Sequence, residues 1–535
     1  MFKQYGVMLN QEGAGLNVEQ SKKYAKILKD MGYDYMLFYL ETSYEIEGQP
    51  YFGHFRGRYT KEELKEINDY CDSIGLELIP CIEVLGHLAR LFQRETVYNG
   101  IQDSKGVLLV GHDKTYELIE GMIKTVSECF TSRKINIGMD ETYGLGEGRY
   151  KALYGEEDRY VIFVKHLNRV CEILKKYDYE KPSIWHDMLL HTVADLRKKY
   201  PEEKVEEILK EYQLPEEVSI AYWEYFYHPV EEYTGVIEKL KKFNREILFV
   251  GAAWNWVGLA PDNAFTLRVT EREVPICVDA GIEDISYAVW GTINTPYSVL
   301  PSLMYDIEFS KGNSDLDSIR KKFKEIVGCE FEDFMLFDEI NQCYNDEIRN
   351  GVPLVIDMFY DRHFRPDCIF YSDLFIDNRG SVWKKSDAEH FEKLTEKIHN
   401  VKERGSFGYV FDFYEKLARV LALKVTLGVE IREAYDKKDM DKIKELIAKC
   451  ELTAEKVTEF YEAYRALWLY EKKPHGFHHV DIKVGGLIYR ILDCKRRLED
   501  FANGKVSNIE ELDEPMLKAT NSPRTWGAIV SPGYF

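Results

Sequence analysis

The stretch KINIGMDE, residues 134–141, decides the fold that this sequence predicts. It reads as a buried β-strand that ends in two adjacent carboxylates, Asp140 and Glu141. Similar β-rich runs recur along the first 300 residues, and we expect strands at residues 5–10, 33–41, 76–85, 134–140, 181–188, 217–224, 246–254 and 283–290. Their near-continuous apolar character is typical of a parallel sheet that is buried on both faces.

Amphipathic helical patterns separate these strands. They occupy residues 18–31, 61–73, 114–130, 160–176, 203–212, 230–243 and 265–280. The alternation predicts an α/β fold, a (β/α)₈ TIM barrel over residues 1–305. A doubly wound open sheet is the alternative, but it would need a glycine-rich phosphate turn after its first strand. The turn here, NQEGAG at residues 10–15, is not GxGxxG.

The sequence changes character after about Pro301. Strand patterns nearly vanish, and long charged helical stretches take over at residues 315–327, 387–404, 409–435, 439–471 and 485–501. We therefore expect an all-α C-terminal domain over residues 306–535. Packing, homodimerisation or shielding of the barrel are its expected roles, in preference to a direct part in catalysis.

Composition excludes several classes of partner. The net charge of −21 argues against nucleic acid and anionic membranes, because both need a basic surface. The ten cysteines show no CxxC spacing, as expected for reduced thiols in a cytosolic protein. We also find no signal peptide and no apolar run of 18 residues or more, so the expected location is the cytoplasm.

The carboxyl ends of barrel strands are where active sites form. The predicted strand ends carry carboxylates, one histidine and several tryptophans, which together predict a polar pocket walled by indoles. The residues at these ends are Asn10, Glu41, Glu83, His87, Asp140, Glu141, Trp185, Asp187, Trp223, Glu224, Tyr225, Trp254, Asn255, Trp256 and Trp290.

The adjacency of Asp140 and Glu141 restricts the chemistry. Ordinary glycosidases place two carboxylates on either side of a sugar, about 5 Å apart in retaining enzymes and about 6.5–9.5 Å apart in inverting ones. Neighbouring residues on a strand point to opposite faces, so both can reach one pocket only if the strand has ended. Such a pair acts from one side, with one acid protonating the leaving oxygen and its neighbour holding a group of the substrate.

These residues resemble the GGDE/GMDE signature of glycoside hydrolase family 20, the β-N-acetylhexosaminidases, and most closely the bacterial members that lack an N-terminal domain. The resemblance spans nearly the whole chain. Further matching segments are YFG at 51–53, RGRYT at 56–60, VLLVG at 107–111, GLGEGRY at 144–150, HGF at 475–477 and DIKVGGL at 481–487.

The resemblance implies substrate-assisted catalysis by an exo-acting, retaining enzyme. Glu141 would be the general acid/base, and Asp140 would orient the 2-acetamido group whose oxygen forms an oxazoline. Tyr225 would steady that oxygen, and Trp185, Trp223, Trp290 and Trp254 would surround the acetamido methyl group. Glu83, His87 and Asp187 would hold Asp140 and Glu141 in place. For His87, an ordinary buried histidine is an equally open interpretation. The chemistry needs no cofactor.

Two departures from the family concern recognition of the sugar. Relatives carry an arginine after the first strand and an acidic residue after the last-strand tryptophan, whereas this chain has NQEGAG and WGTIN at those places. Losing two charged hydrogen bonds of about 1.5–3 kcal/mol each would cost an ordinary substrate roughly a hundred-fold or more. Either the sugar differs at O3, O4 or O6, or substitutes do the usual work. The candidate substitutes are Asn10, Gln11, Glu12 and Asn294.

Two other functional classes stay open on the sequence. A glycan-binding protein on a catalytically impaired barrel is the main alternative, although the intact Asp140–Glu141 pair argues against it. A metal hydrolase is the other, since His475, His478 and His479 cluster in the helical part. We find no zinc-binding quartet, so no metal is expected.

Overall fold

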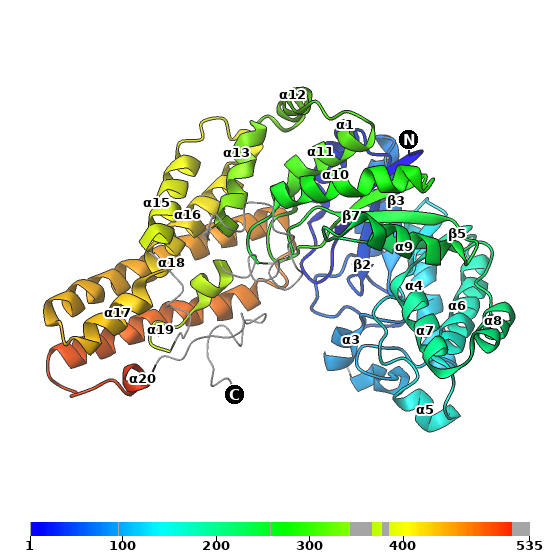
Figure 1. The fold of residues 1–535 in the computed structure, drawn as a ribbon, viewed down its shortest axis with the longest axis horizontal. Helices are drawn as coiled ribbons and strands as arrows, with labels where there is room; N and C mark the ends of the chain where they lie inside the picture. Colours follow the sequence, from blue (N-terminus) through cyan, green and yellow to red (C-terminus); the bar gives the residue numbers. More distant parts are fainter. Residues whose placement is uncertain (1, 95, 257, 343–365, 377–384, 516–535) are drawn as a thin grey trace. The chain divides into compact units, whose positions relative to one another are not determined.

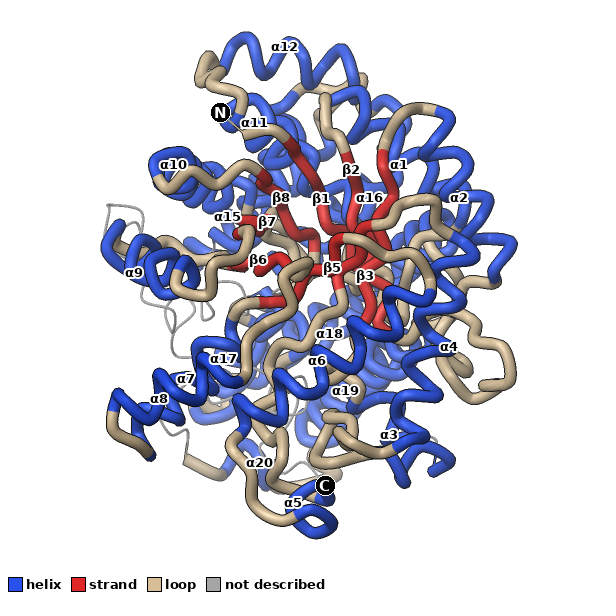
Figure 2. The backbone as a smooth tube through the Cα atoms, turned by 90° about the vertical axis from the view of Figure 1, so that its right-hand side faces the viewer, coloured by secondary structure: helices blue, strands red, loops and turns tan. Residues whose placement is uncertain are grey.

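The computed structural model describes residues 2–94, 96–256, 258–342, 366–376 and 385–515 (Figure 1). Eight parallel strands close into one barrel in chain order, and helices surround them (Figure 2). The predicted TIM barrel is therefore confirmed. The strands are β1 (Gln4–Asn10), β2 (Tyr35–Glu41), β3 (Glu77–Ile82), β4 (Lys134–Asn136), β5 (Lys181–Trp185), β6 (Ser219–Trp223), β7 (Ile247–Ala252) and β8 (Asp284–Val289).

The barrel helices begin and end close to the predicted positions. Two of them show why: the Asn17 side chain accepts a hydrogen bond from the backbone N–H of Gln20 at the start of α1, and Thr60 and Glu63 form a reciprocal capping box on α2. The helices up to residue 327 are α1 (Val18–Met31), α2 (Lys61–Ser73), α3 (Ala89–Arg94), α4 (Asp113–Cys129), α5 (Arg149–Tyr154), α6 (Arg159–Lys176), α7 (Asp187–Lys199), α8 (Glu202–Glu211), α9 (Val230–Lys241), α10 (Asn263–Asp279), α11 (Leu300–Ser310) and α12 (Leu316–Val327).

Several predicted strands are too long, and the errors in the fourth and fifth strands matter for the site. The fifth strand ends at Trp185, and Asp187 begins a helix, α7, that the sequence analysis missed. The apolar run around residue 188 fits strand or helix equally well, whereas an acidic residue in a first helical turn is favoured by the helix dipole. The fourth strand ends at Asn136 because Gly138 and Met139 have positive φ angles of 68° and 76°.

The chain forms two compact units. The barrel unit comprises residues 1–253, 266–292 and 303–319, and the helical unit comprises residues 254–265, 293–302 and 320–535. Two short segments next to β7 and β8 thus belong to the helical unit. The predicted boundary between residues 305 and 306, as a division into independently folding domains, stays a prediction.

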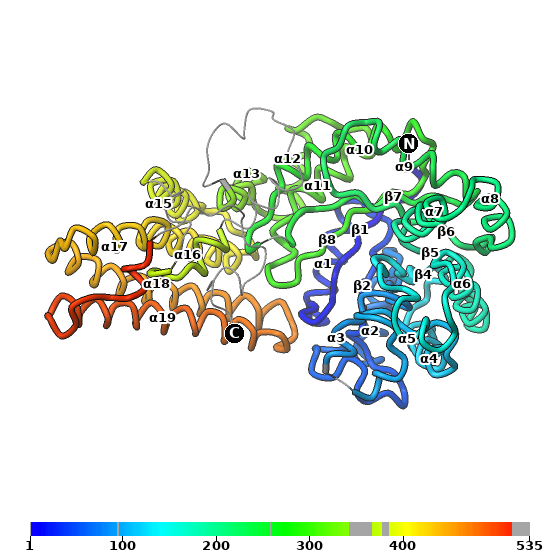
Figure 3. The backbone as a smooth tube through the Cα atoms, turned by 60° about the horizontal axis from the view of Figure 1, so that its bottom comes forward, coloured from blue at the N-terminus to red at the C-terminus, as the bar shows by residue number. Residues whose placement is uncertain are grey.

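The helical unit is built around long helices that run side by side, α18 and α19 among them (Figure 3). In α18 the buried residues recur at helical spacing, as at Ile443, Leu446, Cys450 and Val457. The expected helix at 409–435 is two helices. The elements are α13 (Phe331–Met335), α15 (Lys385–His399), α16 (Gly408–Lys424), α17 (Leu427–Asp436), α18 (Met440–Glu471), α19 (His478–Ala502) and α20 (Glu510–Asp513).

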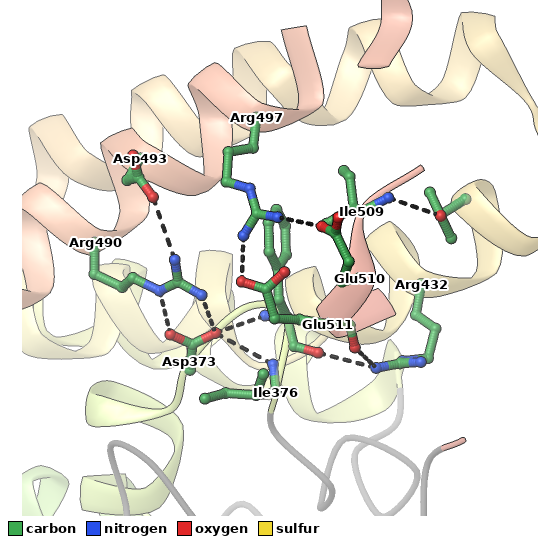
Figure 4. A network of polar contacts seen from close by, with 11 residues as sticks. Asp373, Ile376, Arg432, Arg490, Asp493, Arg497, Ile509, Glu510 and Glu511 are labelled. Carbon is green, nitrogen blue, oxygen red and sulfur yellow. Dashed lines mark hydrogen bonds and ion pairs between the residues drawn. The ribbon is translucent and has the colours of Figure 1, made fainter. Parts of the chain in front are cut away.

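A polar network joins α17, α19 and the segment around α20 within this unit (Figure 4). The buried carboxylate of Asp373 accepts hydrogen bonds from the Arg490 guanidinium of α19 and from two backbone N–H groups. Arg432 of α17 donates to the carbonyl oxygens of Leu512 and Glu514, both at 2.8 Å. These bonds fix the segment around α20 against α17 and α19, which is a structural role.

Two general properties complete the fold. All nine cysteines in the described ranges are buried thiols outside any disulfide; Cys343 lies outside the described residues. No helix in those ranges combines the length and apolar character needed to span a membrane.

Candidate active site

Asp140 and Glu141 meet a single histidine at the carboxyl end of the barrel. His87 Nε2 lies 3.0 Å from Asp140 Oδ2 and 3.6 Å from Glu141 Oε2. The two carboxylates differ in environment, because the side chain of Asp140 is 12% exposed and that of Glu141 is 48% exposed. Asp140 Oδ1 is buried and accepts no hydrogen bond from the described residues. Asp140 is therefore fixed and has one unused acceptor oxygen, whereas Glu141 is open to a ligand.

The backbone explains how two neighbouring residues reach one site. The strand has ended by residue 137, and Met139 and Glu141 both adopt positive φ, at 76° and 46°. His87 and Glu41, at two other strand ends, do the same with φ of 53° and 47°. Positive φ in residues other than glycine costs about 1–3 kcal/mol each and gathers at functional sites. The backbone at the rim of the barrel is thus strained, and this strained backbone brings the Asp140 and Glu141 carboxylates to one site.

Glu83 packs against the backbone of residues 138 and 139. It is fully buried at the end of β3, accepts a hydrogen bond from the Tyr39 hydroxyl at 3.1 Å, and faces the backbone N–H of Met139 at 3.4 Å. Burial, and then the charge of Asp140, raise the pKa of Glu83 well above its usual range. A Cβ added at Gly138 would lie 2.0 Å from Glu83 Oε2. Glycine at residue 138 thus lets the chain pass over Glu83.

The charges of the site centre on His87. Burial alone would lower the pKa of His87, but the Asp140 carboxylate, followed by Glu83 and Glu141, outweighs it and raises this pKa to about 11. The imidazole is therefore a cation at neutral pH. Asp187 accepts the backbone N–H of Glu141 at 2.9 Å, and burial, followed by the Asp140 charge, raises the pKa of Asp187 to about 7.

Several aromatic side chains lie close to groups of this centre. Trp223 stacks on Tyr225 with ring centroids 5.2 Å apart, and Trp290 packs edge-on against Tyr39 at 5.0 Å. Burial raises the pKa of Tyr225 well above its ordinary value, and the charge of Asp140 adds to the shift, which places this hydroxyl near the carboxylate. Trp185 is fully buried and lines a small cavity inside the barrel, together with Leu37 and Ile79.

A second charged cluster forms beside the first. Glu12, after β1, binds Arg56 Nη2 at 2.8 Å and Arg90 Nε at 3.3 Å, and Arg56 also binds the buried carboxylate of Glu41. Burial, followed by the charge of Glu12, raises the pKa of Glu41 to about 7. Burial, followed by the charges of Glu83, Glu41, Asp140 and Glu12, raises the pKa of Tyr39 well above its usual value, so both clusters lie near its hydroxyl.

The remaining predicted residues have other surroundings. Asn10 holds the backbone, donating to the Trp290 carbonyl at 3.0 Å and accepting from the Glu12 N–H at 2.8 Å. Trp254 and Asn294 belong to the helical unit, where Trp254 stacks on Trp256 at 3.8 Å and the Asn294 amide donates to the Asn255 carbonyl. Within the described residues, no group of three or more His, Cys, Asp or Glu side chains could hold a metal ion.

The sequence analysis did not assign several residues that the structure brings to this rim. Arg56 was noted only as part of a family motif, and Tyr39, Arg90 and Tyr143 were not singled out. Tyr143 is close to the site, since Glu141, Asp187 and Asp140 add to burial in raising its pKa. An arginine within the RGRYT segment, which resembles the family, was the one usable signal. Its pairing with Glu12, 44 residues away, is visible only in the fold.

Comparisons with known proteins agree with this architecture. The model described as the glycosyl hydrolase family 20 catalytic domain matches residues 18–234, and the glycoside hydrolase 20C C-terminal domain matches residues 366–530. Hexosaminidase D of Bos taurus is 24% identical over 190 residues, and that of Homo sapiens is 25% identical over 191 residues; each match covers 34% of this chain. The chain spans 55% and 39% of the length of these two relatives.

Solved structures are matched as well. An N-acetyl-β-hexosaminidase of Streptomyces plicatus, in complex with thio-NAglucal, has 17% sequence identity and a TM-score of 0.46, and the match covers 61% of this chain and 69% of that one. A β-N-acetylhexosaminidase of Bacteroides fragilis has 20% identity and a TM-score of 0.46, covering 61% and 70%.

We predict that Gly138→Ala destabilises the barrel more than a matched glycine change does. The added methyl group would collide with Glu83, and overpacking of this kind costs about 1–3 kcal/mol. Gly281→Ala is the control, because Gly281 has a similar φ of 75° but open space around it. The free energy of unfolding in urea measures both. Equal losses would show that Glu83 moves aside freely.

We further predict that Asp187 makes the stability fall between about pH 4 and pH 7. Its pKa is raised from 3.8 to about 7 in the folded protein, so the folded state binds this proton more tightly than the unfolded state does. The resulting stabilisation is complete below about pH 4 and is lost as the pH rises to 7. In Asp187→Asn the unfolding free energy should decline less over this range, while exposed Asp69→Asn should follow the wild type. Parallel curves for Asp187→Asn and the wild type would contradict the assignment.

Proposed function

The chain belongs to glycoside hydrolase family 20, and from that premise we propose that it is an exo-acting, retaining glycosidase that removes a terminal β-linked N-acetylhexosamine. One observation carries the proposal. Asp140 is held by His87 through Oδ2, whereas its buried Oδ1 has no partner among the described residues. An amide N–H of a bound substrate would satisfy that acceptor. A buried acceptor left unpaired costs about 1–3 kcal/mol, so the site gains by binding such a group.

The proposed reaction uses the acetamido group of the substrate as the nucleophile. Glu141 donates a proton to the glycosidic oxygen while the acetamido oxygen attacks the anomeric carbon, and the bond to the leaving group breaks. Asp140 accepts the acetamido N–H and stabilises the positive charge of the oxazoline intermediate. Water then adds to the anomeric carbon, Glu141 takes its proton, and the acetamido group is restored. Two carboxylates on one side suffice, because the protein supplies no nucleophile.

The remaining rim residues fit this scheme. Tyr225, stacked on Trp223 and near Asp140, would donate a hydrogen bond to the acetamido oxygen. Trp223 and Trp290 would line the sides of the acetamido pocket, and Trp185 its floor. Trp254 and Asn294 stay predictions, as do a homodimer and a cytoplasmic location. A glycan is the proposed partner.

We propose that the sugar is recognised in an altered way, through Arg56, Glu12 and Arg90. The arginine that relatives carry after the first strand is absent, but Arg56 reaches the same rim from the loop after β2 and pairs with Glu12 and Glu41. Arginine and carboxylate groups together can donate to and accept from hydroxyls. Because their arrangement differs from the family pattern, we expect a different preference at O3, O4 or O6, such as a galacto-configured, substituted or sulfated N-acetylhexosamine.

We predict that Glu141→Gln lowers kcat/KM about 10²–10⁴-fold on substrates with a sugar leaving group. The loss should be much smaller on p-nitrophenyl substrates, whose leaving group needs little protonation. Exposed Glu147→Gln, six residues along the chain, is the matched control and should retain full activity. If the wild type binds glycans but turns over no N-acetylhexosaminide, the chain is the glycan-binding alternative instead.

We also predict that Glu12→Gln lowers kcat/KM by about 10-fold or more on the preferred sugar, since hydrogen bonds to charged groups contribute about 1.5–3 kcal/mol. Glu45→Gln, in the loop that carries Arg56, is the control and should change little. A panel of aryl gluco-, galacto- and 6-sulfated N-acetylhexosaminides measures the preference. Full, ordinary activity of the wild type on the plain gluco substrate would contradict altered recognition.

A further inference from the structure

The barrel unit contains a cavity of about 560 Å³ that is separate from the candidate active site. It lies between α7, α8 and α9, and we call it the α7–α9 cavity. Its lining is formed by Tyr160, Leu190, Val193, Ala194, Arg197, Leu209, Gln213, Leu214, Lys239, Lys242, Phe243, Asn244 and Arg245. Pockets for small ligands occupy about 300–1,000 Å³, so the volume suits a molecule of that size and excludes a folded partner.

The lining combines an apolar wall with four cations. Leu190, Val193, Leu209, Leu214 and Phe243 supply apolar surface, and the cations come from two helix ends and the start of β7. Among these described lining residues there is no carboxylate. Basic residues at the ends of α7 and α9 are expected from the helix dipole alone. The dipole does not explain why they converge on one cavity in a protein with a net charge of −21.

The cationic groups differ in their freedom to bind a ligand. Arg245 is fixed, since its Nε donates to the Pro215 carbonyl and its Nη1 to the Asn244 carbonyl, both at 2.8 Å. Arg197 shares its charge with Glu202 of α8 at 3.1 Å. Lys239 and Lys242 are exposed and stand three residues apart at the end of α9. The field in the cavity therefore comes from a fixed guanidinium and two lysines.

Helix α7 connects this cavity to the candidate active site. Residues 190, 193, 194 and 197 face the cavity. Three residues spaced four apart, Asp187, His191 and Asp195, contact the catalytic segment. Asp187 binds the Glu141 N–H at 2.9 Å and the His191 ring packs edge-on against Tyr143 at 5.3 Å.

The third of these contacts runs through Arg159. Its guanidinium pairs with Asp195 and donates to the Tyr143 carbonyl at 2.5 Å. Because the cavity-lining residues and these three contacts share helix α7, a shift on its cavity side would act on residues 141–143 through the contacts.

We propose that the α7–α9 cavity is a second binding site, for a small amphipathic anion with an apolar body and a single sulfonate, phosphate or carboxylate group. The apolar body would lie on the leucine and phenylalanine wall, and the anion would meet Lys239, Lys242 and Arg245. The structural effect of a bound ligand would be transmitted through α7 to Glu141. The binding is independent of the proposed function, whereas its effect on turnover rests on that function.

The binding is tested with 8-anilinonaphthalene-1-sulfonate, whose fluorescence rises in apolar surroundings. The wild type should bind one equivalent, with N-phenyl-1-naphthylamine, which lacks the sulfonate, binding at least 10-fold more weakly. Lys242→Glu should raise Kd about 10-fold or more, and Ala194→Trp, which fills the cavity from an exposed helix residue, should abolish binding. Lys210→Glu on α8 has the same charge change outside the cavity and should bind as the wild type does.

Two results would overturn the binding site. The first is that both Lys242→Glu and Ala194→Trp bind 8-anilinonaphthalene-1-sulfonate as tightly as the wild type does. The second is that the wild type binds the neutral probe as tightly as it binds the sulfonate. Because Lys242 is exposed, its variant remains informative even if Ala194→Trp fails to fold. Trp223→Ala should bind as the wild type does, which separates this cavity from the indole-lined active site.

The linkage is tested by backbone hydrogen exchange, which needs no catalysis. At saturating probe, exchange at residues 141–143 should change at least several-fold in the wild type and stay constant in Ala194→Trp. A peptide around β8 serves as the internal control. Unchanged exchange at 141–143 with the cavity occupied would overturn the linkage. Failure of the proposed function would be seen separately, as the absence of any hydrolysis that Glu141→Gln could reduce.

Discussion

The ion pair between His87 and Asp140 is the interaction on which the candidate site depends. Four carboxyl groups, Glu83, Asp140, Glu141 and Asp187, converge at the carboxyl ends of three neighbouring strands. Without a cation among them, mutual repulsion and burial would favour protonation of the group. The imidazolium of His87, with its pKa raised to about 11, supplies that charge. For Glu83, the most deeply buried of the four, burial and then the charge of Asp140 raise the pKa well above its usual range.

This distribution of charge depends in turn on the backbone. His87, Met139 and Glu141 all adopt positive φ, and Gly138 passes over Glu83 where no Cβ could fit. A regular strand through residue 141 would send the two carboxylates to opposite faces of the sheet. The early end of β4 at Asn136 removes that constraint. The strain is held by fixed partners on either side, Glu83 below and Asp187 beside, and the carboxylates are therefore ordered before any substrate arrives.

How far the sequence leads can be judged from particular residues. The barrel follows from strand and helix periodicity, and the acidic pair, Glu83, His87 and the tryptophans at residues 185, 223 and 290 follow from their places at strand ends. Helix α7 was missed because the apolar run after Trp185 is compatible with either structure. The pairing of Glu12 with Arg56 and Arg90 could not be found, since it joins two loops and helix α3, which only barrel closure brings together. Trp254 and Asn294 were assigned by strand position, although their segments pack with the helical unit.

Closure of the barrel also explains how a recognition group can come from a different loop of the chain and still lie at the same part of the rim. In the pairing of β1 with β2, Asn10 lies opposite Tyr39, so the segments that follow both strands emerge side by side at the rim. Glu12 and Glu41, each two residues further on, are then near enough to share one guanidinium. An arginine from the loop after β2 can therefore occupy the region that a residue after β1 would otherwise serve. Because Arg56 is also needed to balance the buried Glu41, its position is fixed by charge pairing rather than by the sugar. A site built in this way would recognise hydroxyls with groups that are already oriented, and its preference would follow from the Arg56–Glu12 geometry.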